Sequence, residues 1–258
     1  MALGQIKAKH RTAGQAKPKS AKVVGPQGNG APARVPEIPP LENGDRLTRW
    51  EFERRYEALP HVKKAELIEG VVYMPSPARM GHAVPHSSIM MWLTVYAAHT
   101  PGLTVADNGT LRLDADNEVQ PDAMLLSPPQ SGGRARVSDD DFAEGAPELV
   151  VEVALSSASY DRHIKKNVYR RTGVQEYVIW VVRDARVEWY VLEEGEYLPL
   201  PPDPDGITRS RVFPGLYLDA QALLAGDGAK VLAVLQEGLA SEAHAEFVKR
   251  LSSASAAP

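Results

Sequence analysis

The run ELVVEVA at residues 148–154 constrains the fold more than any other part of the sequence. After Glu148 the run is apolar except for Glu152, which is typical of a strand buried on both faces of a sheet. A carboxylate inside such a strand carries a large desolvation cost unless it is paired, protonated or bound to a cation. Glu152 therefore predicts a buried ion pair or a metal site inside the core.

The rest of the sequence alternates strand-like and helix-like segments, so we predict an α/β fold. Thr48 and Glu51 match a capping box, and a short helix is expected to follow and to end before Pro60. The strand-like segments are 66–74, 103–106, 110–113, 123–127, and a hairpin of 176–182 and 186–192. The helix-like segments are 86–99, about 160–172 with Gly173 after its last turn, and about 219–224, 229–239 and 241–251. The polar stretch 128–146 is interpreted as a long loop that borders the site.

Residues 1–41 are rich in Lys, Gly, Ala and Pro and show no apolar period, which predicts a disordered basic tail. Residues 1–40 carry seven Lys or Arg and one acid, which leaves 22 basic and 32 acidic residues for the remainder. Such an acidic domain is not typical of a simple DNA-binding module, because phosphate affinity comes largely from Lys and Arg. Two roles stay open for the tail: holding nucleic acid, or acting as a solvated, dispensable segment.

Composition excludes several classes of protein and site. No run approaches the ~18 apolar residues of a membrane span, and the N-terminus lacks the apolar region of a secretory signal, so we expect a cytoplasmic protein. Cysteine is absent, which excludes disulfides, thiolate zinc sites, iron–sulfur clusters and cysteine nucleophiles. The sequence also lacks G-x-S-x-G, H-E-x-x-H and a Gly-rich phosphate loop. Any metal must therefore bind through oxygen or imidazole.

Asp122 precedes the strand-like residues 123–127, which could lie beside the strand that carries Glu152. Two carboxylates that meet in a core repel each other unless a hard cation lies between them. Mg²⁺ suits this arrangement, because it commonly takes one or two protein carboxylates and completes its shell with water and substrate phosphate. The sequence therefore predicts a Mg²⁺ site at Asp122 and Glu152, in which Mn²⁺ could substitute.

Asp161, Lys165 and Tyr169 are spaced by four residues and so share one face of the predicted helix. Lys165 could reach the carboxylate pair, neutralise it without metal, and stabilise charge that develops on a phosphate. Alternatively, Asp161 and Lys165 form a surface ion pair of ~0.3–0.5 kcal/mol. The spacing alone leaves both interpretations open.

Three further polar residues are weaker candidates for the site. Glu69 could be an additional ligand, or it could face solvent at the end of a strand. His86 opens the predicted helix 86–99 and His82 stands in the preceding turn. A histidine at a helix start is more often a capping or surface residue than a metal ligand.

Taken together, these motifs resemble a known family. They resemble the motifs of the Uma-two family of endonucleases. The likeness rests on the acid and glycine in ELIEGVVYMPSP, a His before a helix, the motifs PD and EVA, and the spacing D-x-x-x-K-x-x-x-Y-x-x-x-G-V-x-E-Y. That family belongs to the PD-(D/E)XK nuclease superfamily, and the likeness covers most of residues 45–225. The resemblance implies a restriction-endonuclease-like mixed β-sheet core flanked by helices, at residues 42–226, followed by a C-terminal helical extension at 227–258.

The resemblance also implies roles for individual residues. Asp122 is the acid of the PD element, Glu152 is the second acid, and Glu69 matches the acid of the earlier strand. The usual lysine position is occupied by Ala154, so the resemblance implies a lysine on the following helix. Lys165 is the better match and Lys166 the second choice, because Lys166 points about 100° away on an ideal helix.

We therefore expect a Mg²⁺-dependent endonuclease that hydrolyses phosphodiester bonds, with DNA as the substrate implied by the resemblance. The catalytic candidates are Asp122, Glu152, Lys165 and Glu69, and the accessory candidates are His86, Asp161, Tyr169 and Lys166. The alternative is a nuclease-fold protein that has lost catalysis and serves as a binding module. A homodimer is plausible for cutting two strands, because one site cuts one strand.

Overall fold

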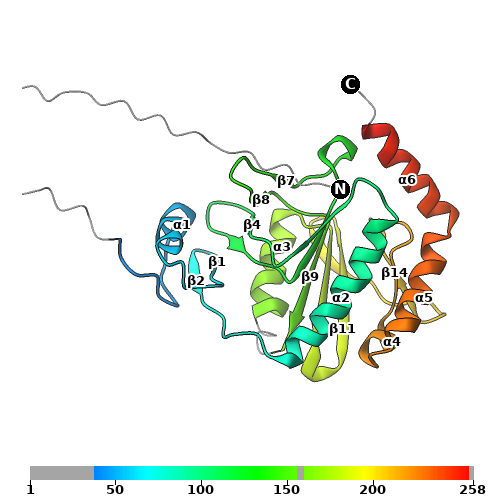
Figure 1. Ribbon diagram of the computed structural model, residues 1–258, viewed down its shortest axis with the longest axis horizontal. Helices are drawn as coiled ribbons and strands as arrows, with labels where there is room; N and C mark the ends of the chain where they lie inside the picture. Colours follow the sequence, from blue (N-terminus) through cyan, green and yellow to red (C-terminus); the bar gives the residue numbers. More distant parts are fainter. Residues whose placement is uncertain (1–37, 156–159, 256–258) are drawn as a thin grey trace, which may run out of the picture. The chain divides into compact units, whose positions relative to one another are not determined.

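Two six-stranded mixed sheets form the framework of the computed structural model, which describes residues 38–155 and 160–255 (Figure 1). Residues 1–37 of the predicted basic tail lie outside the described residues. Helices flank the sheets, and a separate two-stranded pair completes the strands. The predicted α/β class, with a mixed-sheet core flanked by helices, is confirmed.

The main sheet has the strand order β12-β11-β10-β9-β6-β3. β9 and β10 pair in parallel, and the other neighbours pair antiparallel. The strands predicted around 103–106, 123–127 and 148–154 and the hairpin after Gly173 are confirmed to within about two residues. The bounds are β3 (Thr104–Asp107), β6 (Ala123–Leu126), β9 (Leu149–Ala154), β10 (Glu176–Val181), β11 (Arg186–Glu193) and β12 (Glu196–Pro199).

The second sheet consists of very short strands in the order β2-β1-β5-β4-β8-β7. The single strand predicted at 66–74 is wrong: Glu69 and Gly70 have φ values of 52° and 72° and fold it into a two-residue hairpin. The long loop predicted at 128–146 is also interrupted by a 3-10 turn, η1 (Pro129–Ser131), and two strands. The bounds are β1 (Glu66–Ile68), β2 (Val71–Tyr73), β4 (Leu111–Arg112), β5 (Glu118–Val119), β7 (Arg136–Val137) and β8 (Ala143–Glu144).

Helix α1 (Arg49–Glu57) begins after Thr48, as predicted, but the capping box is absent. Thr48 makes no side-chain cap hydrogen bond, and Glu51 instead accepts hydrogen bonds from Arg54 and Arg55. The two guanidinium groups offer the carboxylate opposite charges as well as hydrogen-bond donors, whereas a backbone amide offers only a donor.

Helix α2 (Met80–Ala98) begins six residues before the predicted start, with Pro85 inside it. His86 therefore does not open the helix, and His82 lies in its first turn rather than in a preceding loop. The predicted helix 160–172 is divided into a π-helical segment, η2 (Tyr160–Lys165), and α3 (Lys166–Thr172). Gly173 ends it in the left-handed conformation with φ 95°, as predicted.

The C-terminal part contains β13 (Ile207–Arg209), β14 (Tyr217–Asp219), α4 (Ala220–Leu224), α5 (Gly228–Leu239) and α6 (Glu242–Ser255). Leu235 of α5 and Leu251 of α6 belong to the same apolar cluster as Trp92 of α2 and Val151 of β9. The C-terminal helices thus pack on one face of the main sheet, where Figure 1 shows α2 and α4–α6.

The opposite face of the main sheet has its own apolar cluster, which includes Val150, Ala154 and Tyr169 of α3. Because side chains alternate along a strand, Val151 and Val153 face α2 whereas Val150, Glu152 and Ala154 face α3. The chain crosses from the second sheet to the main sheet between β5 and β6, at residues 120–122. In the described ranges no helix is long and apolar enough to cross a membrane.

Candidate active site

Glu152 is 2% exposed on the α3 face of β9, where apolar neighbours surround it. Its Oε1 accepts hydrogen bonds from Lys165 Nζ at 3.0 Å and from the Tyr169 hydroxyl at 2.7 Å. The desolvation cost of the Glu152 carboxylate is thus offset, in the protein alone, by a buried ion pair and a hydroxyl donor.

Lys165 and Tyr169 both reach Glu152, as their spacing of four residues permits. Lys165 Nζ also lies 2.9 Å from Glu66 Oε1, so one ammonium group bridges two buried carboxylates. Lys166 points elsewhere: its Nζ lies 3.3 Å from the centre of the Tyr190 ring. The side chain of Asp161 lies outside the described residues, so its relation to Lys165 stays a prediction.

Glu66, at the start of β1, is a member of this cluster that the sequence analysis did not single out. Its Oε1 also accepts a hydrogen bond from the backbone amide of Gln120 at 2.8 Å, which ties β1 to the crossing between the sheets. A signal for Glu66 existed, because it lies beside Ala65 and Leu67 as Glu152 lies between valines. Such neighbours predict a buried acid at Glu66, as they do at Glu152.

Glu69 is not brought into this cluster. It occupies the β1–β2 turn, its side chain is 48% exposed, and its Oε1 accepts a hydrogen bond from Arg171 at 2.9 Å. Successive side chains along a strand point to opposite faces. Glu69 lies in the turn and is not part of a strand, so it does not share the face of Glu66. Of the two acids, Glu66 is the one beside Lys165.

Asp122 lies at the crossing between the sheets, just before β6, and is 4% exposed. Because Ala123 pairs with Val151 in an antiparallel register, Asp122 falls opposite Glu152. Its Oδ2 accepts a hydrogen bond from the Val153 backbone amide at 2.7 Å. Burial raises the pKa of Asp122, but the His82 hydrogen bond, the Lys64 charge and the Val153 amide outweigh burial and hold the pKa below its usual value.

Two histidines of α2 contact Asp122. His82 Nε2 lies 3.2 Å from each of the two carboxylate oxygens. His86 Nε2 lies 2.9 Å from the Asp122 backbone oxygen and 3.2 Å from Asp107 Oδ1. Both histidines thus border the candidate site. His82 contacts the carboxylate of Asp122, and His86 contacts its main chain.

The donor set fits some metals and not others. In residues 38–155 and 160–255 no group of three or more His, Asp or Glu side chains is arranged to hold a metal ion. A site built largely by protein ligands is therefore not present there. A pair of carboxylates would suit a Mg²⁺-class ion, which takes few protein ligands and keeps several waters. Asp122 and Glu152 are the residues that would hold it.

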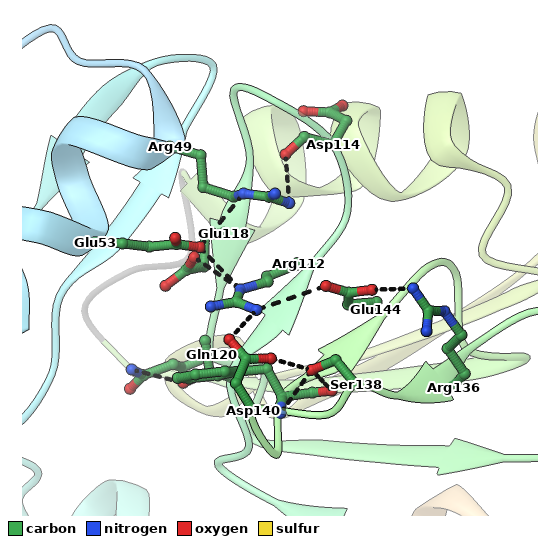
Figure 2. Close-up of polar contacts among 12 residues, drawn as sticks. Arg49, Glu53, Arg112, Asp114, Glu118, Gln120, Arg136, Ser138, Asp140 and Glu144 are labelled. Carbon is green, nitrogen blue, oxygen red and sulfur yellow. Dashed lines mark hydrogen bonds and ion pairs between the residues drawn. The ribbon is translucent and has the colours of Figure 1, made fainter.

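A second charged cluster lies on the short-stranded sheet, and we call it the Arg112 cluster. Figure 2 shows Arg112 at its centre, with acidic side chains from α1, β5, β8 and the loop before β8 directed toward it. The distances from its guanidinium are 2.8 Å to Glu53, 3.7 Å to Glu118, 2.7 Å to Asp140 and 3.5 Å to Glu144. No pattern in the sequence predicted this cluster.

Glu118 is the most strongly perturbed acid of the Arg112 cluster. Burial, together with the hydrogen bond and charge of Glu53, raises the pKa of Glu118 to about 8, against the opposing charges of Arg112 and Arg49. Two residues farther along, Gln120 holds Glu66 through its amide. The cluster thus lies on the strand that leads into the candidate active site.

A search of curated proteins gives no match. Among solved structures, the chain is similar to a "putative nuclease belonging to DUF820" from Anabaena variabilis ATCC 29413, with 16% sequence identity and a TM-score of 0.53. The match covers 67% of this chain and 96% of that chain. At this identity the likeness shows the fold alone.

The model of the Uma2 family, described as "Putative restriction endonuclease", matches residues 50–221. This range contains Glu66, Asp122, Glu152 and Lys165, and it is well over half of the 258 residues. The resemblance drawn from the sequence motifs is confirmed. The chain belongs to the Uma2 family of restriction-endonuclease-like proteins.

Proposed function

We propose that this protein is a metal-dependent endonuclease that hydrolyses phosphodiester bonds in DNA. The observation that carries the proposal is the buried cluster in which Lys165 bridges Glu66 and Glu152, with Asp122 opposite Glu152 just before the neighbouring strand β6. An acid before one strand, an acid within its neighbour and a nearby lysine are the parts that the PD-(D/E)XK pattern requires. Membership of the Uma2 family supports the nuclease class.

The charge balance of the cluster favours a cation. Lys165 contacts two buried carboxylates, those of Glu66 and Glu152, whereas the third, Asp122, contacts His82 and is influenced by the charge of Lys64. The excess of buried negative charge is costly, and a divalent ion held by Asp122 and Glu152 would offset it. When bound there, Mg²⁺ would polarise the scissile phosphate and favour ionisation of the attacking water.

The protein's own groups would act on the substrate as follows. Lys165 would place a positive charge where negative charge develops on the phosphate. Tyr169 and the Val153 amide each donate to one carboxylate, Glu152 and Asp122 respectively, and keep it oriented. Glu66 would hold the lysine in place through its 2.9 Å contact.

Cleavage of supercoiled plasmid and of single-stranded DNA tests the proposal. The purified protein is incubated with Mg²⁺, with Mn²⁺ and with chelator, beside Asp122→Asn and Glu152→Gln. We expect nicked or linear DNA with either metal, and no cleavage with chelator or with either variant. Cleavage that survives both substitutions would exclude this site as the catalytic centre.

Two aspects of the proposal are decided by the same assay. A protein that cuts no DNA under any metal condition would instead be the inactive binding or interaction module. The acidic balance of residues 41–258 keeps that alternative open, because it counts against tight binding of duplex DNA. Linear product without a nicked intermediate would support paired active sites in a homodimer, because one site cuts one strand.

A further inference from the structure

We propose that His82 is a positioning residue that fixes the orientation of the Asp122 carboxylate. The inference rests on the proposed function, because the oriented carboxylate is the one that would bind the metal. His82 has no assigned role in that function, and its place in the first turn of α2 was not apparent from the sequence.

The hydrogen bonds around Asp122 come from two different elements. His82 Nε2, from α2, is 3.2 Å from both Oδ1 and Oδ2, and the Val153 amide, from β9, is 2.7 Å from Oδ2. The terminal torsion of an aspartate is broad, so one donor would leave the plane of the carboxylate free to rotate. Two donors from different directions restrict that rotation.

His86 contacts a different part of Asp122, although it lies only one helical turn from His82. Its Nε2 is 2.9 Å from the Asp122 backbone oxygen, and because a carbonyl only accepts, this nitrogen carries the proton. The amide of Asn108 donates to the same oxygen at 3.3 Å. The main chain of Asp122 is therefore held by His86 and Asn108, whereas its carboxylate is held by His82 and Val153.

Residues that orient a metal ligand typically change metal affinity about 10- to 100-fold when they are removed. We expect His82→Leu to lose the donor and to weaken metal binding within this range. His82→Gln retains an N–H donor on a side chain of similar reach and should recover most of the affinity. A purely structural role would not make this distinction between the two variants.

Mn²⁺ alone, without DNA, is the probe, and its dissociation constant is measured from the electron paramagnetic resonance signal of the free ion. The wild-type protein is compared with His82→Leu, His82→Gln and His99→Leu, a control at the exposed far end of the same helix. We expect affinity to fall about 10- to 100-fold in His82→Leu only. Equal affinity in His82→Leu and wild type, while Asp122→Asn binds no Mn²⁺, would overturn the proposal.

A measurement without metal separates this proposal from the proposed function. The Val153 amide proton reports on its 2.7 Å bond to Asp122, and its chemical shift should change in His82→Leu but not in His99→Leu. If wild type binds no Mn²⁺, the proposed function fails, yet a shifted Val153 amide would still support positioning by His82. An unchanged Val153 amide in folded His82→Leu would refute the positioning role by itself.

Discussion

Lys165 Nζ lies 3.0 Å from Glu152 Oε1, although Lys165 belongs to the helical segment that follows β9 and not to β9 itself. On β9, the position two residues after Glu152 is Ala154, which is buried against the α3 face. A lysine that comes from the helix can contact Glu152 and Glu66 at once. The ion pair therefore joins the two sheets as well as supplying a charge to the site.

Loss of the Lys165 ammonium should destabilise the fold strongly. Lys165→Met leaves two buried carboxylates without their shared cation, and removing one partner of a buried ion pair costs about 3–5 kcal/mol. Lys166→Met loses a cation–π contact with Tyr190 and should cost about 1 kcal/mol. Urea denaturation of both variants without divalent metal measures the difference, and similar losses would contradict the bridging role.

Glu66 and Glu69 form a matched pair of acids, three residues apart, for an activity test. If Glu66 holds Lys165, Glu66→Gln should lower DNA cleavage by about 10- to 100-fold, as positioning residues at metal sites do. Glu69→Gln removes a half-exposed ion pair with Arg171 and should leave the rate within about twofold, because such pairs contribute little. Plasmid nicking rates measured with Mg²⁺ decide between the two acids. A larger loss of rate in Glu69→Gln than in Glu66→Gln would mean that Glu69, the acid that the resemblance implied, supports catalysis.

A divalent metal should stabilise the folded protein through Asp122. A ligand that binds only the folded state adds about 2.7 kcal/mol at 100 times its dissociation constant. We therefore expect Mn²⁺ to raise the thermal unfolding midpoint of wild type and chelator to reverse the rise. Asp122→Asn should show no rise, and an equal rise in that variant would place metal binding elsewhere on the chain.

The parts of the fold that were predicted correctly have long, regular apolar patterns. β9 and the β10–β11 hairpin were recognised because several consecutive residues carry the signal. β5 and β8 have two residues each, too few for any period to be read. The predicted start of α2 was six residues too late, because the helix begins at Met80 and continues through Pro85.

The candidate site was predicted to the extent that it depends on local spacing. Lys165 and Tyr169 were found together because residues four apart share a helix face. Glu66 was overlooked although its apolar neighbours mark it as a buried acid. The positive φ that places Glu69 in a turn, by contrast, is not visible in the sequence. The Arg112 cluster draws residues from segments as far apart as Glu53 and Glu144, and no local pattern brings these together.

Stability should fall as the pH rises through the range in which Glu118 loses its proton. In the unfolded chain Glu118 takes its ordinary pKa of 4.5, whereas burial beside Glu53 raises the folded value to about 8. Between these two pH values the folded state holds a proton that the unfolded state has lost, so stability decreases with pH by up to about 1.4 kcal/mol per pH unit. Below pH 4.5 both states are protonated, and above pH 8 both have lost the proton.

Glu118→Gln isolates this contribution, because glutamine stays neutral beside Glu53 at every pH. Free energies of unfolding measured between pH 5 and pH 9 should fall less steeply in Glu118→Gln than in wild type. Glu237→Gln, an exposed substitution on α5, should keep the wild-type slope. If the free energy of unfolding had the same pH dependence in wild type and Glu118→Gln, the folded protein would not hold a proton on Glu118. The four acids around Arg112 would then all be ionised and stabilised by water.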